Sequence, residues 1–138
     1  MADENKKKFN GPKVLDDTRQ LARMLDELQD SFDHKHKYGC GNDLQHLTAD
    51  MLLCLRRSQT YTDFHKRANA LEEFLADLDT VQDLLGLIAA CCAVPRNKLE
   101  LVFRKMDEVT PQIKGLRSYF ARVASQNPGF MPPSQGGT

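Results

Sequence analysis

The side chains best suited to metal binding are gathered near the start of the chain, at Asp33, His34, His36, Cys40 and His46. Histidine and cysteine are the usual zinc ligands, and a structural zinc site takes four ligands in a tetrahedron. The spacing His-x-His-x3-Cys-x5-His matches no strong zinc signature, and the charges of Lys35 and Lys37 oppose a divalent cation. We therefore predict a solvated polar loop without metal. The alternative is a zinc site formed by His34, His36, Cys40 and His46.

Other reactive residues lack the neighbours that catalysis requires. Cys91 and Cys92 are adjacent, and neighbouring positions on a helix point about 100° apart. They therefore lack the Cys-x-x-Cys geometry of a redox pair. We expect both to be buried structural thiols. His65 has no nucleophile placed near it by sequence. Paired carboxylates, such as Glu72 and Glu73, fall on polar helix faces, and no Glu-x-x-His motif, phosphate-binding loop or nucleophile elbow occurs. We predict that the protein is not an enzyme and needs no cofactor.

The elements that carry these residues are predicted to be helices. Apolar residues recur at spacings of three and four along most of the chain, which is the pattern of amphipathic helices. Short connections favour antiparallel neighbours. The sequence therefore predicts an all-α, up-and-down bundle of four to five helices, near 14–33, 43–57, 62–78, 80–93 and 95–124. These form one domain, 13–125, between disordered tails at 1–12 and 126–138.

Three details of these helices follow from single residues. The pair Asp79-Thr80 could stop a helix, and Thr80 with Asp83 resembles the capping box of a new one. We therefore predict a break or kink near Asp79, although the apolar stripe continues and one long helix is the alternative. At Pro111 the stripe also continues, and we predict one kinked helix; a fresh helix capped by Thr110 is the alternative. The stretch Leu84–Val94 is apolar nearly all round, which predicts a central, well-buried segment.

Charge is balanced overall but divided unevenly between the later helices. The chain carries 19 basic and 19 acidic residues, so nothing global draws it to nucleic acid or to a membrane. Residues 63–92 hold six acids and two bases, whereas residues 93–125 hold seven bases and three acids. Antiparallel packing with complementary flanking charges explains this. The alternative is a basic face for an acidic partner, phosphates or nucleic acid, formed by Arg104, Lys105, Lys114, Arg117 and Arg122.

The cysteines and the absence of an apolar leader indicate the compartment. Four cysteines occur, and the N-terminal Met-Ala-Asp-Glu-Asn-Lys-Lys-Lys contains no apolar segment of a signal peptide. We expect reduced thiols and an intracellular protein, cytoplasmic or nuclear. Since a membrane span needs roughly 20 apolar residues, the run Leu84–Val94 is too short, and we predict no membrane segment.

By elimination, and from the long apolar stripes in the first and last helices, we expect a non-catalytic protein–protein interaction module, an adaptor or assembly subunit. Such stripes can pack against a partner helix as well as within their own bundle. We expect the partner to be another protein or a second copy of the chain, rather than nucleic acid or a small molecule. Because arginine and aromatic residues dominate interface hot spots, the predicted partner-binding residues on the last helix are Phe103, Arg104, Met106, Ile113, Arg117 and Phe120.

One segment is similar to a known family. The stretch from Gln20 to Phe74, with Phe64-His65-Lys66-Arg67 after a polar link, resembles the helical TAFH co-regulator domain of transcription factors. The resemblance would imply a role in transcription regulation. The remainder of the chain does not follow that pattern, so no residue roles are carried over.

Overall fold

The chain forms an all-α helical bundle, as predicted. The structure is a computed structural model that describes residues 11–91 and 94–126. In these residues the long helices are α2 (Gly11–Leu28), α4 (Cys40–Thr60), α5 (Phe64–Cys91) and α6 (Arg96–Gln126). The short helices η1 (Gln29–Ser31) and α3 (His34–Lys37) lie between α2 and α4. The predicted tails fall outside the described residues, except that Gly11 and Pro12 already belong to α2 and Gln126 to α6.

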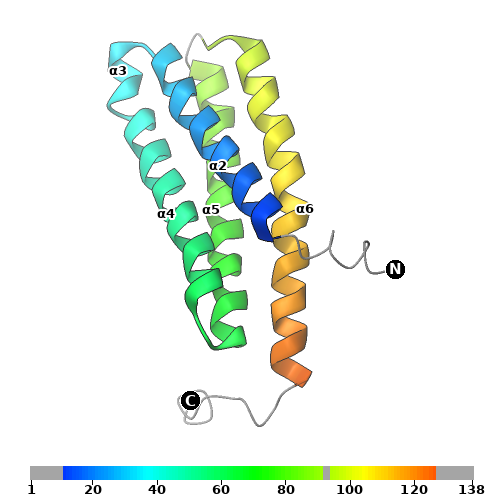
Figure 1. Cartoon of the computed structure of the whole chain (residues 1–138). Helices are drawn as coiled ribbons and strands as arrows, with labels where there is room; N and C mark the ends of the chain where they lie inside the picture. The colour runs from blue at the N-terminus through cyan, green and yellow to red at the C-terminus, as the bar shows by residue number, and fades with distance from the viewer. Residues whose placement is uncertain (1–10, 92–93, 127–138) are drawn as a thin grey trace.

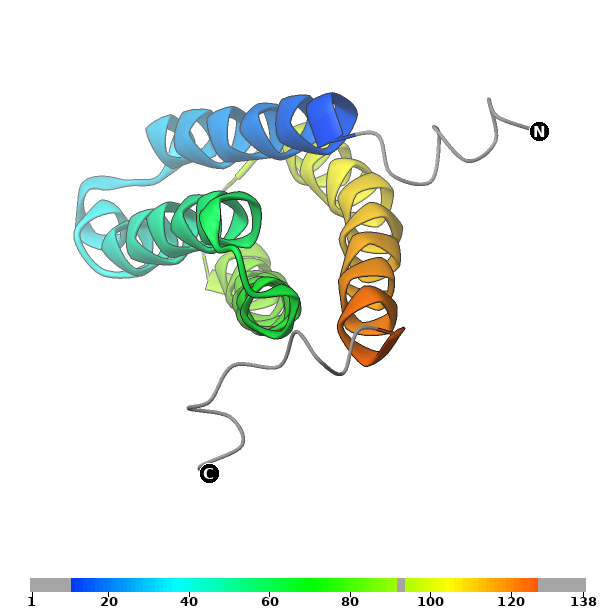
Figure 2. The same cartoon turned by 60° about the horizontal axis from the view of Figure 1, so that its bottom comes forward.

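Helices α4 and α5 run antiparallel, side by side, and α6 lies along the other side of α5 (Figure 1). Helix α2 crosses the bundle and contacts both α6 and α4, as the view along the bundle shows (Figure 2). The short links Tyr61–Asp63 and 92–95 make the antiparallel arrangement a direct consequence of chain length. No described helix is long and apolar enough to cross a membrane.

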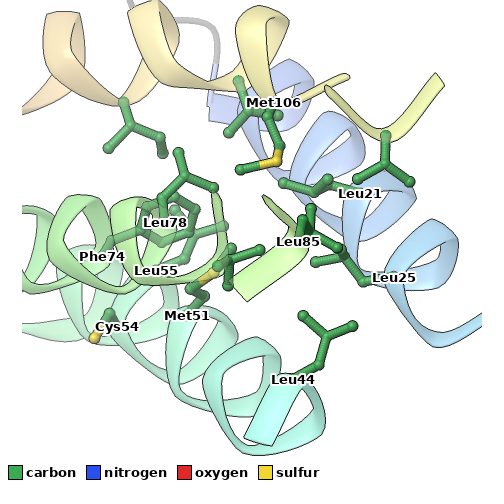
Figure 3. Packing of buried hydrophobic residues seen from close by; sticks show 14 of the residues in the cluster. Leu21, Leu25, Leu44, Met51, Cys54, Leu55, Phe74, Leu78, Leu85 and Met106 are labelled. Atoms are coloured by element: carbon green, nitrogen blue, oxygen red, sulfur yellow. The ribbon is translucent and has the colours of Figure 1, made fainter. Parts of the chain in front are cut away.

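The core sits where the four long helices meet. Figure 3 shows Leu21 and Leu25 from α2 facing Leu85 from α5 and Met106 from α6. Phe74 of α5 is fully buried. The predicted stripe of α6 is buried along most of its length, at Leu99, Val102, Met106, Val109, Ile113, Leu116 and Phe120. Its last predicted member, Val123, is half-buried.

The predicted break near Asp79 is wrong, because α5 is continuous from Phe64 to Cys91. Leu78, Val81 and Leu85 continue one buried stripe across the predicted break. The Thr80 hydroxyl donates to the Ala76 carbonyl oxygen at 3.1 Å, a contact made inside a helix, rather than capping a new one. The burial of the stripe outweighs the weak local start signal.

Helix α6 also runs through its proline. Pro111 lies inside the helix at an exposed position, so the predicted single helix is confirmed and the fresh helix is not formed. The buried positions Val109 and Ile113 on either side share the core with α5 and α2, which holds the two turns in one register.

Three other predictions need correction. Cys91, expected to be a buried thiol, is exposed, and Cys92 lies outside the described residues. The region 33–41 is not an open loop, because α3 occupies His34–Lys37 and α4 begins at Cys40 rather than near residue 43. Asp33 stabilises this turn by accepting a hydrogen bond from the His36 backbone N–H at 2.9 Å. The stretch Leu84–Val94 is not buried all round: Leu87 is 52% exposed, and Gly86 faces open space.

A buried carboxylate fixes α2 against α6. Asp17 of α2 is 6% exposed and accepts hydrogen bonds from Lys13 Nζ at 2.8 Å and from Gln112 Nε2 of α6 at 2.7 Å. Lys105 Nζ of α6 lies 3.6 Å from its other oxygen. Burial alone would raise the pKa of Asp17, but the hydrogen bonds and charges of these partners outweigh it, so the pKa is lowered.

Candidate functional site

The six partner-binding residues predicted on α6 do not form one exposed surface. Met106, Ile113 and Phe120 are buried in the core and are therefore inaccessible while the bundle is closed. Phe103 is half-buried against the same core, and Arg104 is exposed. Arg117 Nη1 lies 2.5 Å from Glu72 Oε1 of α5. The apolar stripe of α6 therefore packs inside the bundle, against α5 and α2.

The predicted basic face of α6 is divided among its neighbours. Lys105 points to Asp17 of α2, and Arg117 points to Glu72 of α5. Arg122 lies over the Tyr119 ring at 5.9 Å. The pair between Arg117 and Glu72 matches the predicted complementarity of α5 and α6. Two of the five bases therefore already pair with acids of the protein itself.

The structure does not gather His34, His36, Cys40 and His46, the ligands of the alternative zinc site, into one group. The His34 ring packs edge-on against Tyr38 at 4.9 Å, and His36 Nδ1 lies 2.6 Å from Asp33 Oδ1. Cys40 is half-buried against the core, and His46 lies farther along α4 beside a different hollow. Among the described residues, the ligand-type side chains that meet within 4.8 Å are instead Asp50, Cys54 and Asp77.

The best candidate for a binding surface is a groove between α2 and α4. One hollow of about 550 Å³ and another of about 330 Å³ share Ala49 and Leu52 in their walls. We call the two together the α2–α4 groove. Leu52 and Leu53 are exposed by 37% and 42% in this region. The groove has apolar walls, formed by Leu15, Ala22, Ala49, Leu52, Leu53 and Leu55.

The edges of the α2–α4 groove are mainly basic. Arg19 and Arg23 lie one turn apart on α2, and Arg56 lies on α4 across the first hollow. No ion pair between described residues includes any of these three arginines. Asp26 is the acidic residue in the walls. The groove therefore combines exposed leucines with cationic groups that lack an acidic partner in the described part of the chain.

Sequence reasoning missed this groove although a signal was present. The run Met51-Leu52-Leu53-Cys54-Leu55 is apolar at five successive positions. Five residues of a helix cover more than a full turn, so such a run cannot be buried on one side only. Met51, Cys54 and Leu55 face the core, which leaves Leu52 and Leu53 outside. The three-and-four spacing identifies one apolar stripe on α4, and Leu52 and Leu53 lie outside that stripe.

A second cluster lies on another side of α4, against α5. Asp50 and Cys54 are one turn apart on α4, and the Cys54 thiol donates to Asp50 Oδ2 at 3.9 Å. Asp77 of α5 meets both side chains within 4.8 Å. Figure 3 shows Cys54 at the margin of the core side chains. An adjoining hollow of about 420 Å³ has Asp50, Asp77 and His46 in its walls, so the cluster borders solvent.

The electrostatics of this cluster are unfavourable as they stand. Burial, together with the nearby Asp50 carboxyl and the charges of Asp50 and Glu73, raises the pKa of Asp77 to about 7. Burial and the neighbouring acids also raise the pKa of the Cys54 thiol to about 12, against a smaller lowering by Arg57. Asp77 Oδ2 is buried without a hydrogen-bond partner. No ion pair between described residues neutralises Asp50 or Asp77.

Comparison with known proteins gives no family for this chain. No protein-family model matches the sequence, and no curated protein or solved structure is significantly similar to it.

Proposed function

We propose that this protein is a non-catalytic protein–protein interaction module whose α2–α4 groove receives an acidic amphipathic helix of a partner protein. The observation that carries the proposal is the pairing of exposed leucines, Leu52 and Leu53, with the unpaired arginines Arg19, Arg23 and Arg56 around one groove. Groove recognition of a helix uses an apolar face for affinity and charges at the edge for orientation.

The dimensions of the groove suit a helical segment. Its walls extend from Leu15 of α2 to Gln29 at the start of η1, and from Gln45 to Thr60 along α4. At 1.5 Å per residue this is a length of roughly 20 Å, which accommodates about four turns of a partner helix. Leucines of such a helix would cover Leu52 and Leu53, and removing these side chains from water supplies the main attraction.

The charges select the sign of the partner. Arg19 and Arg23 project from consecutive turns of α2, and Arg56 stands on the opposite wall. Glutamates or aspartates on the two flanks of the bound helix would pair with both walls. A basic helix would meet three like charges and be repelled. The position of Asp26 near one end would favour a basic or neutral residue at that end of the partner.

The proposal is tested with a set of designed peptides and the full chain. The probe is a fluorescein-labelled, 18-residue amphipathic helix with leucines on one face and glutamates on its flanks; a lysine-flanked peptide and a scrambled peptide are the references. Fluorescence polarisation is expected to show saturable binding of the acidic peptide alone. Replacing both α2 arginines, Arg19→Glu with Arg23→Glu, should weaken binding at least about tenfold.

The matched control is Arg104→Glu, an exposed arginine of α6 outside the groove. It should leave the affinity unchanged, as should Leu101→Lys, whose leucine is 49% exposed on α6. Equal binding of acidic and basic peptides, no binding of the acidic peptide, or equal loss in the control variants would each reject the proposal. Binding of a second copy of the chain, seen as dimers by light scattering and lost in Leu52→Lys, would replace the partner with the protein itself.

A further inference from the structure

We infer that His46, Asp50, Cys54 and Asp77 form a binding site for a divalent transition metal, with zinc as the best-matched ion. The inference is independent of the proposed groove, because this site lies between α4 and α5 rather than between α4 and α2. It also differs from the candidate zinc site of the sequence analysis, with which it shares only His46.

Helix geometry brings three of the side chains together and places His46 one turn before Asp50 on α4, beside the same hollow. His46, Asp50 and Cys54 follow one another at intervals of four residues on α4, so they share one face of that helix. Asp77 faces them from α5, and the ligand atoms of Asp50, Cys54 and Asp77 lie within 4.8 Å of one another. His46 stands in the wall of the hollow that also exposes Asp50 and Asp77. Ligands one turn apart on a helix are a usual zinc-binding arrangement.

A cation would remove the unfavourable features of the cluster. Asp50 and Asp77 hold two carboxyl groups together, Glu73 adds a further negative charge, and no base among the described residues forms an ion pair with them. Asp77 Oδ2 is buried and lacks a hydrogen-bond partner. Burying a polar oxygen without a partner costs free energy, and neutral packing residues at these positions would avoid that cost. A divalent ion would supply both the missing charge and the missing contact.

The ligand types select the class of ion. A thiolate is a soft ligand, and together with imidazole and carboxylate it suits zinc and related transition metals. Calcium and magnesium prefer sites made wholly of oxygen ligands. A zinc-bound cysteine is a thiolate, so the ion displaces the proton of the Cys54 thiol, which passes to solvent through the hollow beside Asp50 and Asp77.

The test uses the full chain after removal of metal with a chelator. Zinc is titrated against a competing chromophoric chelator, and cobalt is added in parallel as a spectroscopic substitute. We expect one zinc ion per chain, an increase in Tm with zinc, and a sulfur-to-cobalt charge-transfer band in the near ultraviolet. Cys54→Ser should abolish this band. Asp77→Asn and Asp50→Asn should each weaken zinc binding by about tenfold or more.

The controls separate this site from other thiols and from a purely structural role. Cys40→Ser should retain the band and the affinity, because Cys40 belongs to the loop that the structure does not assemble into a site. Asp77→Asn should keep or raise the Tm of the metal-free protein while losing the zinc-dependent increase. The inference fails if zinc and cobalt do not bind, if binding survives in both Cys54→Ser and Asp77→Asn, or if Cys40→Ser removes the cobalt band.

Discussion

Asp17 joins α2 to α6 through Lys13, Gln112 and Lys105, and it is the most heavily paired carboxylate of the described residues. Its pKa is lowered, so its contribution to stability is present above the ordinary carboxyl pKa and is lost as the pH falls below that value, through the lowered pKa of the folded protein. Asp17→Asn should therefore lower the free energy of unfolding at pH 7 by about 1–3 kcal/mol, measured by urea denaturation. The difference from the unsubstituted protein should shrink toward pH 3.

The neighbouring Asp16 provides the control for this prediction, because it is exposed and forms no ion pair with a described residue. Asp16→Asn should change the unfolding free energy by less than about 0.5 kcal/mol. If the two variants were equally stable across this pH range, the link between α2 and α6 would not depend on the Asp17 carboxylate.

The sequence was least informative about single residues, that is, about which side chains lie outside the core and which ones meet. The functional candidates Leu52 and Leu53 follow from counting five apolar residues in succession, but nothing local tells which two of the five lie outside. The meeting of Asp77 with Asp50 and Cys54 depends on the register between α4 and α5, which spacing within one helix does not contain. The His and Cys residues near the start of α4 looked more promising because they are close in sequence, yet α3 and α4 turn them apart.

At the scale of elements, the continuity of α5 can be tested at Thr80. In a continuous helix the Thr80 side chain only returns a hydrogen bond to Ala76, so alanine is the better helix former at this exposed position. Thr80→Ala should leave the unfolding free energy unchanged or raise it by up to about 0.5 kcal/mol. Thermal and urea denaturation measure this directly.

A true cap on the same helix gives the reference for that experiment. Asp63 accepts a hydrogen bond from the His65 backbone N–H at 2.9 Å at the start of α5. Asp63→Ala should cost about 1 kcal/mol, the usual loss for an N-cap. A similar loss in Thr80→Ala would mean that a helix begins there in solution, in disagreement with the continuous α5.

Helix existence was predictable because apolar spacing of three and four reports burial directly. The apolar stripe of α6 continues past Pro111 in both sequence and structure, since Val109 and Ile113 are buried on either side. Helix ends were less predictable. The signal at Asp79 is a local preference of modest size, and the packing of Leu78 and Val81 against the rest of the core overrides it.

At the scale of the whole molecule, the core uses the residues that sequence analysis assigned to a partner. Ile113 is fully buried where α6 meets the other helices. Ile113→Ala should lower the unfolding free energy of the isolated chain by about 2–5 kcal/mol, because it leaves a cavity in the core. Chemical denaturation is the measurement, and Leu101→Ala on the exposed side of α6 is the control, with a change below about 0.5 kcal/mol.

An Ile113→Ala variant as stable as the unsubstituted protein would contradict the burial of Ile113 in the core and would favour α6 as a partner surface.

The bundle architecture was predictable from the number and length of the stripes. The choice of which surface stays open was not, because it depends on how α2 crosses the other helices, and that crossing leaves the α2–α4 groove with its leucines uncovered.

Binding in the α2–α4 groove is tested most directly by methyl NMR of the full chain with labelled leucine, recorded with and without the acidic amphipathic peptide. Peptide addition should shift the methyl signals of Leu15, Leu52 and Leu53, whereas the signals of Leu87 and Leu101, which are more exposed than Leu52 and Leu53 but lie outside the groove, should stay in place. Shifts concentrated at Leu101 on α6, or spread equally over all the exposed leucines, would contradict binding in the groove.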